Sequence, residues 1–277
     1  MLGPPKKADN RLRVIAVTSG KGGVGKSNIT ANLAVLAAQA GRRVLIIDAD
    51  LGLANVEILF GVTPKYNLSH LLDESVPIDE VLARGPHGIR ILSSGSGLQA
   101  LTKLSEHQRL QLLRALDPLE NWFDLVLIDS GAGIGDNVLF FVGAAHEVLL
   151  IVQPEPTSLT DAYATVKVLS QLGGVHNFNV IVNTAESDVE ARDLFQKLTR
   201  VSTQFLKAKI NYLGYVPRDP NLHKAVTSQR PMVELFPTSP ASQALAALSN
   251  TLLSAQAPSN VDGGLKFLWQ RLLRESA

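Results

Sequence analysis

The sequence predicts an α/β fold: a mostly parallel sheet with helices on both faces, followed by an amphipathic helix at the C-terminus. Three observations support this. Short apolar runs alternate with helical stretches along the chain, a glycine-rich loop joins the first strand to the first helix, and polar residues or turns follow the apolar runs. Strands buried on both faces read as continuous apolar runs, and strands that alternate with helices pair in parallel.

The predicted elements follow one another in a regular order. The expected strands are 13–18, 44–47, 88–92, 125–128, 147–152, 178–182 and 210–216, and the expected helices include 27–40, 106–116, 159–172 and 189–206. The first helix carries Ile29, Leu33, Leu36 and Ala40 at helical spacing on one face. Because such sheets bind ligands beyond the carboxyl ends of their strands, we expect the functional site at that edge.

Length and composition limit the class of protein. A chain of 277 residues, 45% of them hydrophobic, can bury a substantial core, and we expect residues 13–255 to form one domain. A flexible lead-in (1–12), a linker (256–263) and a helical tail (264–277) are expected around it. A net charge of +1 gives no general attraction to DNA, so no direct DNA binding is expected.

Cysteine usage and hydropathy exclude further classes. The sequence has no cysteine, which rules out disulfides, thiolate metal sites and the cysteine-ligated iron–sulfur clusters of some related proteins. This fits a cytoplasmic protein. No run of about 18 apolar residues is present, so no membrane-spanning helix is expected.

The glycine-rich loop is the strongest functional signal. Residues 20–27 read Gly20, Lys21, Gly22, Gly23, Val24, Gly25, Lys26 and Ser27, which fits G-x-x-x-x-G-K-[ST]. In this pattern backbone N–H groups cradle phosphates, Lys26 reaches the β- and γ-phosphates, and the Ser27 hydroxyl can bind Mg²⁺. A glycine-rich turn that binds no phosphate could match this pattern by chance. The strand before it and the helix after it place an anion at a helix N-terminus, which favours a phosphate-binding loop.

Three aspartates are expected close to the loop. Asp48 and Asp50 follow the second strand at alternate positions, and Asp129 ends the strand 125–128. Mg²⁺ often keeps several waters, so Asp48 and Asp129 suit its outer shell, and Asp50 is the candidate for orienting the attacking water. Isolated acids of this kind would be read as solvated turn residues. Beside the loop, they predict a Mg²⁺-dependent ATP hydrolase.

Recognition of the base is left open by the residues alone. Asn183 closes a strand and offers both a donor and an acceptor to an adenine edge. Pro217, Arg218 and Asp219 follow the next strand and could wall the same pocket. Ordinary turn chemistry explains these residues equally well.

The C-terminal segment has an amphipathic pattern. Leu265, Leu268, Trp269, Leu272 and Leu273 share one helical face, and Lys266, Gln270 and Arg274 lie on another. Such a helix suits an anionic membrane surface. A helix docked on the domain's own core gives the same pattern. The Gly263-Gly264 hinge before it favours a reversible anchor formed by residues 265–274.

The loop and the aspartates together resemble the MinD/ParA family of ATPases. The resemblance covers residues 12–275 and includes Asp48-Ala49-Asp50-Leu51-Gly52-Leu53-Ala54-Asn55-Val56 and Asp129-Ser130-Gly131-Ala132-Gly133-Ile134-Gly135. The run Glu155-Pro156-Thr157-Ser158-Leu159-Thr160-Asp161-Ala162-Tyr163 is similar to the flagellar branch of the family, the FlhG/FleN group.

This resemblance implies a mechanism and partners. It implies ATP-dependent homodimers in which Lys21 of one subunit reaches the other's nucleotide, and it supports adenine contacts at Asn183 and around Pro217. It also implies control of polar flagellar number through a σ54-type transcription activator, at the inner face of the cell membrane and near the pole. The alternatives are a positioning ATPase for cell division or cargo, and a DNA-segregation ATPase. A metabolic ligase or reductase would need a second substrate site, for which we find no residues.

Overall fold

The computed structural model describes residues 12–51, 55–95, 104–172, 174–206 and 208–255. Within these ranges the strands form a single sheet of eight, in the order β3-β4-β2-β5-β1-β6-β7-β8. The strands are β1 (Arg13–Thr18), β2 (Val44–Ala49), β3 (Ala83–Arg84), β4 (Arg90–Leu92), β5 (Leu125–Ser130), β6 (Glu147–Val152), β7 (Asn177–Ala185) and β8 (Lys209–Pro217). Every pair is parallel except β3–β4.

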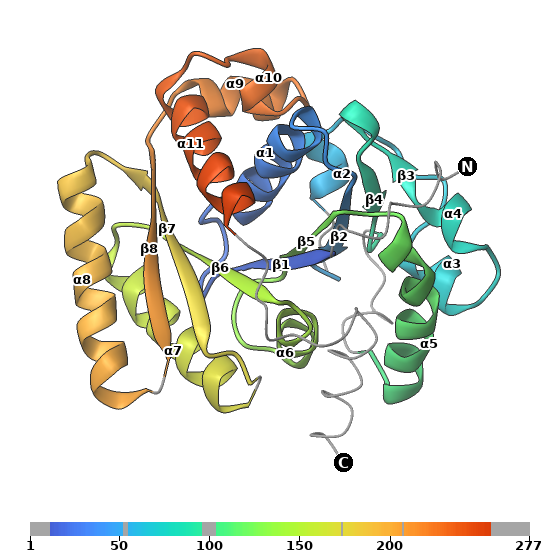
Figure 1. Cartoon of the computed structure of the whole chain (residues 1–277), viewed down its shortest axis with the longest axis horizontal. Helices are drawn as coiled ribbons and strands as arrows, with labels where there is room; N and C mark the ends of the chain where they lie inside the picture. The colour runs from blue at the N-terminus through green and yellow to red at the C-terminus, as the bar shows by residue number, and fades with distance from the viewer. Residues whose placement is uncertain (1–11, 52–54, 96–103, 173, 207, 256–277) are drawn as a thin grey trace.

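The helices pack on both faces of the sheet, as predicted (Figure 1). They are α1 (Lys26–Gln39), α2 (Val56–Leu59), α3 (Leu68–Leu72), α4 (Ile78–Val81), α5 (Glu106–Leu116), α6 (Asp136–Gly143), α7 (Pro156–Gln171), α8 (Asp188–Phe205), α9 (Asn221–Thr227), α10 (Met232–Leu235) and α11 (Pro240–Ser254), with short 3₁₀ turns at Pro86–Gly88 and Asp117–Asn121. The predicted α/β class is therefore confirmed.

The core has two layers that share the strands. Along β1, Val14 and Ala16 point into the layer with α5, α6, α7 and α8, whereas Ile15 and Val17 point into the layer with α1 and α11. Alternate residues of a strand face opposite sides of a sheet, so a fully buried strand such as β1 needs apolar side chains throughout. The extent of this burial determines where each strand ends, and therefore which residues lie at the edge of the sheet.

The structure adds detail at the sheet edge that the sequence did not predict. The expected strand 88–92 begins only at Arg90, because Pro86–Gly88 forms a 3₁₀ turn in which His87 and Gly88 have φ of 51° and 79°. That turn lets β3 fold back against β4 as a short antiparallel edge strand. The predicted helices 159–172 and 189–206 begin three residues and one residue earlier, at Pro156 and Asp188.

Several expectations concern residues outside the described ranges. They are most of the lead-in (1–12), the linker (256–263) and the amphipathic helix (264–277), including its membrane-facing segment 265–274. Among the described residues, the helices are too short or too polar for any of them to cross a bilayer.

Candidate active site

The glycine-rich loop joins β1 to α1 and is held between α7 and the end of β7. A Cβ atom on Gly20 would lie 2.2 Å from the carbonyl carbon of Asp161, and one on Gly25 would lie 2.4 Å from Nδ2 of Asn183. Gly25 also has φ of 93°, in the left-handed region that favours glycine. These two positions therefore require glycine, and the loop opens directly onto the N-terminus of α1.

Lys26 is the first residue of α1, and its side chain is buried. Burial lowers the pKa of its ammonium, while the carboxylates of Asp129 and Asp50 raise it. The cation is thus held in a partly dehydrated loop next to two acids, where phosphate oxygens would be its strongest additional partners.

Asp48 and Asp129 occupy opposite positions of neighbouring strands, at the carboxyl edge of the sheet. The Asp48 carboxylate accepts hydrogen bonds from the backbone N–H groups of Asp50 (3.2 Å), Asn55 (3.0 Å) and Val56 (3.1 Å). Burial and the adjacent Asp129 nevertheless raise the pKa of Asp48 well above its usual range. Two neighbouring buried carboxylates repel each other when both are ionised, and a bound cation would relieve that repulsion.

Asp129 has the acceptor that a bound cation would use. Its Oδ1 accepts a hydrogen bond from Thr30 Oγ1 (3.2 Å), whereas its Oδ2 is buried without a partner among the described residues. Burial raises the pKa of Asp129 to about 6, although the Ser27 hydroxyl, Lys26 and Thr30 lower it. A carboxylate oxygen without a partner is chemically suited to the outer shell of Mg²⁺, the role that the sequence predicts for Asp129.

The raised pKa leads to a stability prediction. Between the ordinary pKa of 3.8 and about 6, the folded state binds more protons at Asp129 than the unfolded state does, so the free energy of unfolding falls as pH rises through this window. The full penalty, at most roughly 3 kcal/mol for such a shift, is present above pH 6.

Asp129→Asn should therefore raise the Tm of the nucleotide-free protein at pH 7.5, and the gain should shrink as pH falls towards 5. Thermal unfolding at both pH values measures this, with the exposed Asp79→Asn as the control. A lower Tm at pH 7.5 would mean that the carboxylate's hydrogen bonds outweigh its burial.

Asp50 follows β2 and is half-buried at the same edge. Its Oδ1 would lie 3.8 Å from a Cβ atom on Gly131, and its charge acts on both Lys26 and Asp129. The loop after β5 is in turn tied to the phosphate-binding loop, because Gly133 N donates to Ser19 O (2.9 Å). The carboxylate that we expected to orient water therefore faces the two loops that would enclose the γ-phosphate.

Lys21 is turned away from the buried acids. Its Nζ lies 2.9 Å from Glu155 Oε2 and 3.4 Å from Thr157 Oγ1, at the start of α7. The side chains of Lys21 and Glu155 are 42% and 50% exposed. An ion pair this exposed contributes little to stability, and the Lys21 ammonium remains accessible to a second molecule.

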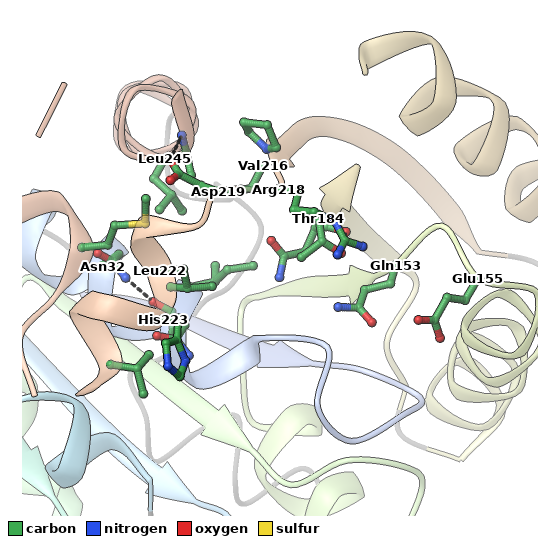
Figure 2. Close-up of a pocket in the computed structure, with 17 residues that line it drawn as sticks. Asn32, Gln153, Glu155, Thr184, Val216, Arg218, Asp219, Leu222, His223 and Leu245 are labelled. Atoms are coloured by element: carbon green, nitrogen blue, oxygen red, sulfur yellow. Dashed lines mark hydrogen bonds between the residues drawn. The ribbon is translucent and has the colours of Figure 1, made fainter. Parts of the chain in front are cut away.

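The residues proposed for base recognition line one cavity of about 440 Å³. Asn183, Pro217, Arg218 and Asp219 all border it, and Figure 2 shows Thr184 and Arg218 across from Leu222 and His223 of α9. Asn183 Nδ2 donates to Val24 O (2.7 Å), which joins this cavity to the phosphate-binding loop. The cavity is therefore placed for a base whose phosphates sit on the loop.

Sequence reasoning missed several residues of this site. Thr30, which binds Asp129, could have been found from its place one turn after Lys26. Thr184 has φ of 59°, unusual for a β-branched residue, and it occupies an irregularity in the β7–β8 pairing. The local sequence carries no signal for that conformation.

Asp219, which the sequence analysis named as a possible cavity wall, accepts hydrogen bonds at its carboxylate from the backbone N–H groups of Asn221 (2.9 Å) and Ala241 (3.3 Å). These bonds hold it in the wall of the cavity.

Comparison with known proteins identifies the family of the chain. The ParA family model, described as NUBPL iron-transfer P-loop NTPase, matches residues 10–253. The antiactivator FleN of Pseudomonas aeruginosa is 46% identical over 266 residues, which cover 96% of this chain and 95% of FleN. The flagellum site-determining protein YlxH of Helicobacter pylori is 30% identical, covering 98% of this chain and 94% of YlxH.

Solved structures lead to the same family. MinD in the MinC:MinD cell division complex of Aquifex aeolicus superposes with a TM-score of 0.72 at 29% identity, covering 91% of this chain and 100% of that one. MinD of Pyrococcus horikoshii, solved with Mg-ADP, gives 0.73 at 25% identity over 88% and 96% of the two chains. The fold, the loop with its acids, and these relatives show that the chain is a P-loop ATPase of the ParA/MinD family.

Proposed function

We propose that this chain is an ATP-dependent dimerising switch that limits the number of polar flagella by restraining a σ54-type flagellar transcription activator. The observation that carries the proposal is the 46% identity to the antiactivator FleN, which extends over nearly the whole of both chains. The similarity to the flagellum site-determining protein YlxH, over a comparable span, supports the flagellar assignment.

In the proposed chemistry, each group of site residues has one task. The backbone of residues 20–27 and the Lys26 ammonium bind the phosphates, while Asn183, Pro217, Arg218 and Asp219 enclose the base. Ser27, Asp48 and Asp129 would hold Mg²⁺, which supplies charge neutralisation at the β- and γ-phosphates when bound. Asp50 orients the attacking water.

Lys21 links hydrolysis to dimerisation in this proposal. In the single chain it is paired with Glu155 on the surface, rather than directed at the chain's own buried acids. On dimerisation, Lys21 would exchange this exposed ion pair for the γ-phosphate of the partner's nucleotide. Breaking the ion pair costs little free energy, because a half-exposed salt bridge contributes little to stability.

A strain that lacks the gene tests the biological assignment. We expect it to carry more flagella per cell than the parent, with the parental number restored by the intact gene and not by a Lys26→Ala copy. Flagella counted by electron microscopy, together with transcript levels of activator-dependent genes, measure this. An unchanged flagellar number would contradict the proposed flagellar function, while the assignment as an ATPase would still hold.

A MinD-type positioning ATPase is the second candidate function. The observation in its favour is the similarity to MinD at 29% identity and a TM-score of 0.72. A deletion strain with normal flagella and misplaced septa would support it. The ParA-family ATPase of Chlorobium tepidum is 19% identical, which supports the shared fold and gives no argument for DNA segregation.

We propose that residues 265–274 attach the ATP dimer to anionic membrane. About ten residues form a marginal helix in water, so the segment should order only when its apolar face is buried. Two copies held in one dimer gain effective concentration, which could raise binding by about 10²–10⁴ over a single copy.

Liposome sedimentation tests this attachment. The protein loaded with ATP should pellet with anionic vesicles and stay in solution with ADP, whereas Trp269→Glu should stay in solution with either nucleotide. A variant with one surface charge reversed elsewhere, Lys65→Glu, serves as the control. Equal pelleting of Trp269→Glu and the parent protein would leave the segment as a docked helix.

A further inference from the structure

Two buried serines directly follow strand β4, beside the candidate active site. Ser93 and Ser94 follow Leu92 and are 1% and 0% exposed. The β2–β4 pairing ends with Ile47 opposite Leu92, so the two serines continue alongside the last residues of β2 and the turn that carries Asp50. A buried hydroxyl is costly unless it is hydrogen-bonded. The partners of these hydroxyls therefore show what the serines hold in place.

The two hydroxyls have different partners. Ser94 Oγ donates to the backbone carbonyl oxygen of Asp50 (3.0 Å). Ser93 Oγ donates to the carboxylate of Glu57 in α2 and accepts a hydrogen bond from Gly95 N (3.1 Å). Only Ser94 contacts the residue that we expect to orient water, while Ser93 ties the same segment to α2.

The backbone that carries Ser94 is itself fixed. Leu68 N, at the start of α3, donates to Ser93 O (2.8 Å). Gly95 has φ of 76° and lies against Asn67, where a Cβ atom would come within 2.5 Å of Nδ2. Asn67 is in turn the residue that caps α3. The Ser94 hydroxyl is therefore presented from a rigid support, and it can restrain a more exposed turn.

Asp50 is held on both of its peptide groups. Its N–H donates to Asp48 Oδ1 (3.2 Å), and its carbonyl accepts from Ser94 Oγ (3.0 Å). These two hydrogen bonds hold the backbone from which the Asp50 side chain extends, and its carboxylate lies on the side facing Gly131 and Lys26. That side is where the γ-phosphate would lie.

We infer that Ser94 is a positioning residue for hydrolysis: it fixes the Asp50 backbone so that the Asp50 carboxylate stays aligned with the attacking water. The inference rests on the proposed role of Asp50. Small errors in the position of a reacting group are costly, since a displacement of about 1 Å can lower a rate by roughly 10²-fold. Loss of one of the two hydrogen bonds that hold the Asp50 backbone should lower the rate by less than this.

Steady-state kinetics of two matched variants test the inference. Ser94→Ala should lower kcat by about tenfold, while KM for ATP stays within about twofold, because its loss affects only alignment in the transition state. Ser93→Ala removes an equally buried hydroxyl and its bond to Glu57, so it should cost comparable thermal stability and retain kcat. Ser94→Thr, which keeps the hydroxyl, should recover most of the lost kcat.

The same measurement in an Asp50→Ala background separates the two hypotheses. If Asp50→Ala hydrolyses ATP normally, the proposed role of Asp50 fails. If Asp50→Ala is slow but Ser94→Ala alone matches the parent, the inference about Ser94 is overturned. It is also overturned if Ser93→Ala lowers kcat as much as Ser94→Ala. A further tenfold loss on adding Ser94→Ala to Asp50→Ala would likewise show that Ser94 acts through another group, whereas no further loss supports the inference.

Discussion

Replacing Lys21 by alanine should leave nucleotide binding largely intact and reduce ATP hydrolysis by about 10³–10⁵-fold, the range given by cations delivered in trans to a γ-phosphoryl group. The physical reason lies in the position of the side chain. Lys21 is paired with Glu155 at the surface and is not directed at its own chain's buried acids, so its loss should spare the loop that binds the phosphates. Fluorescent-nucleotide titration and phosphate release measure the two effects separately, and light scattering should show the loss of ATP-dependent dimers.

Mixing two inactive variants tests whether Lys21 acts between subunits. In a heterodimer of Lys21→Ala with Asp50→Ala, the first chain keeps Asp50 and its nucleotide and receives Lys21 from the second. One site per heterodimer is then complete, and a one-to-one mixture should recover up to about a quarter of the parental rate if the chains pair at random. If Lys21 acted within its own chain, neither site would be complete and the mixture would stay inactive.

The phosphate-binding part of this site could be predicted from the sequence because its chemistry depends on residues that are contiguous or lie at strand ends. The loop 20–27 is continuous, and Asp48 and Asp129 each end a run of apolar residues. Burial of those runs fixes where the strands stop, and parallel pairing then brings both acids to the same edge, opposite one another. The same argument placed Asn183 and Pro217 at one cavity.

Other features depend on tertiary contacts that no local pattern encodes. The pairing of Lys21 with Glu155 joins residues 134 positions apart, and it depends on how α7 packs against Gly20. The contact of Ser94 with Asp50 requires β4 to lie next to β2 in the sheet, although α2, α3, α4 and β3 come between these two strands in the chain. The left-handed conformation of Thr184 opposes the intrinsic preference of a β-branched residue, so it had to be observed.

Replacing Lys26 by alanine should abolish ATP binding or weaken it severely, by on the order of 10²-fold or more, because removing one partner of a buried charged contact costs about 3–5 kcal/mol. The Lys26 side chain is only 8% exposed at the N-terminus of α1, beside Asp129 and Asp50. Without this cation, the phosphates would face three buried or half-buried carboxylates across a short distance. Repulsion would then add to the lost attraction.

Thermal shift and nucleotide titration together measure the effect of Lys26→Ala. A ligand that binds only the folded state stabilises it in proportion to the logarithm of its concentration over Kd, so ATP with Mg²⁺ should raise the Tm of the parent protein and leave that of Lys26→Ala unchanged. Lys26→Met, which keeps the buried apolar stem, should behave in the same way and separates the lost charge from lost packing. Lys65→Ala, at a lysine far along the chain from the loop, is the matched control and should retain the full ATP-dependent shift. If Lys26→Met bound ATP as tightly as the parent protein, the phosphate contacts would have to come from the backbone of residues 20–25 alone, and the role proposed for the Lys26 ammonium would be wrong.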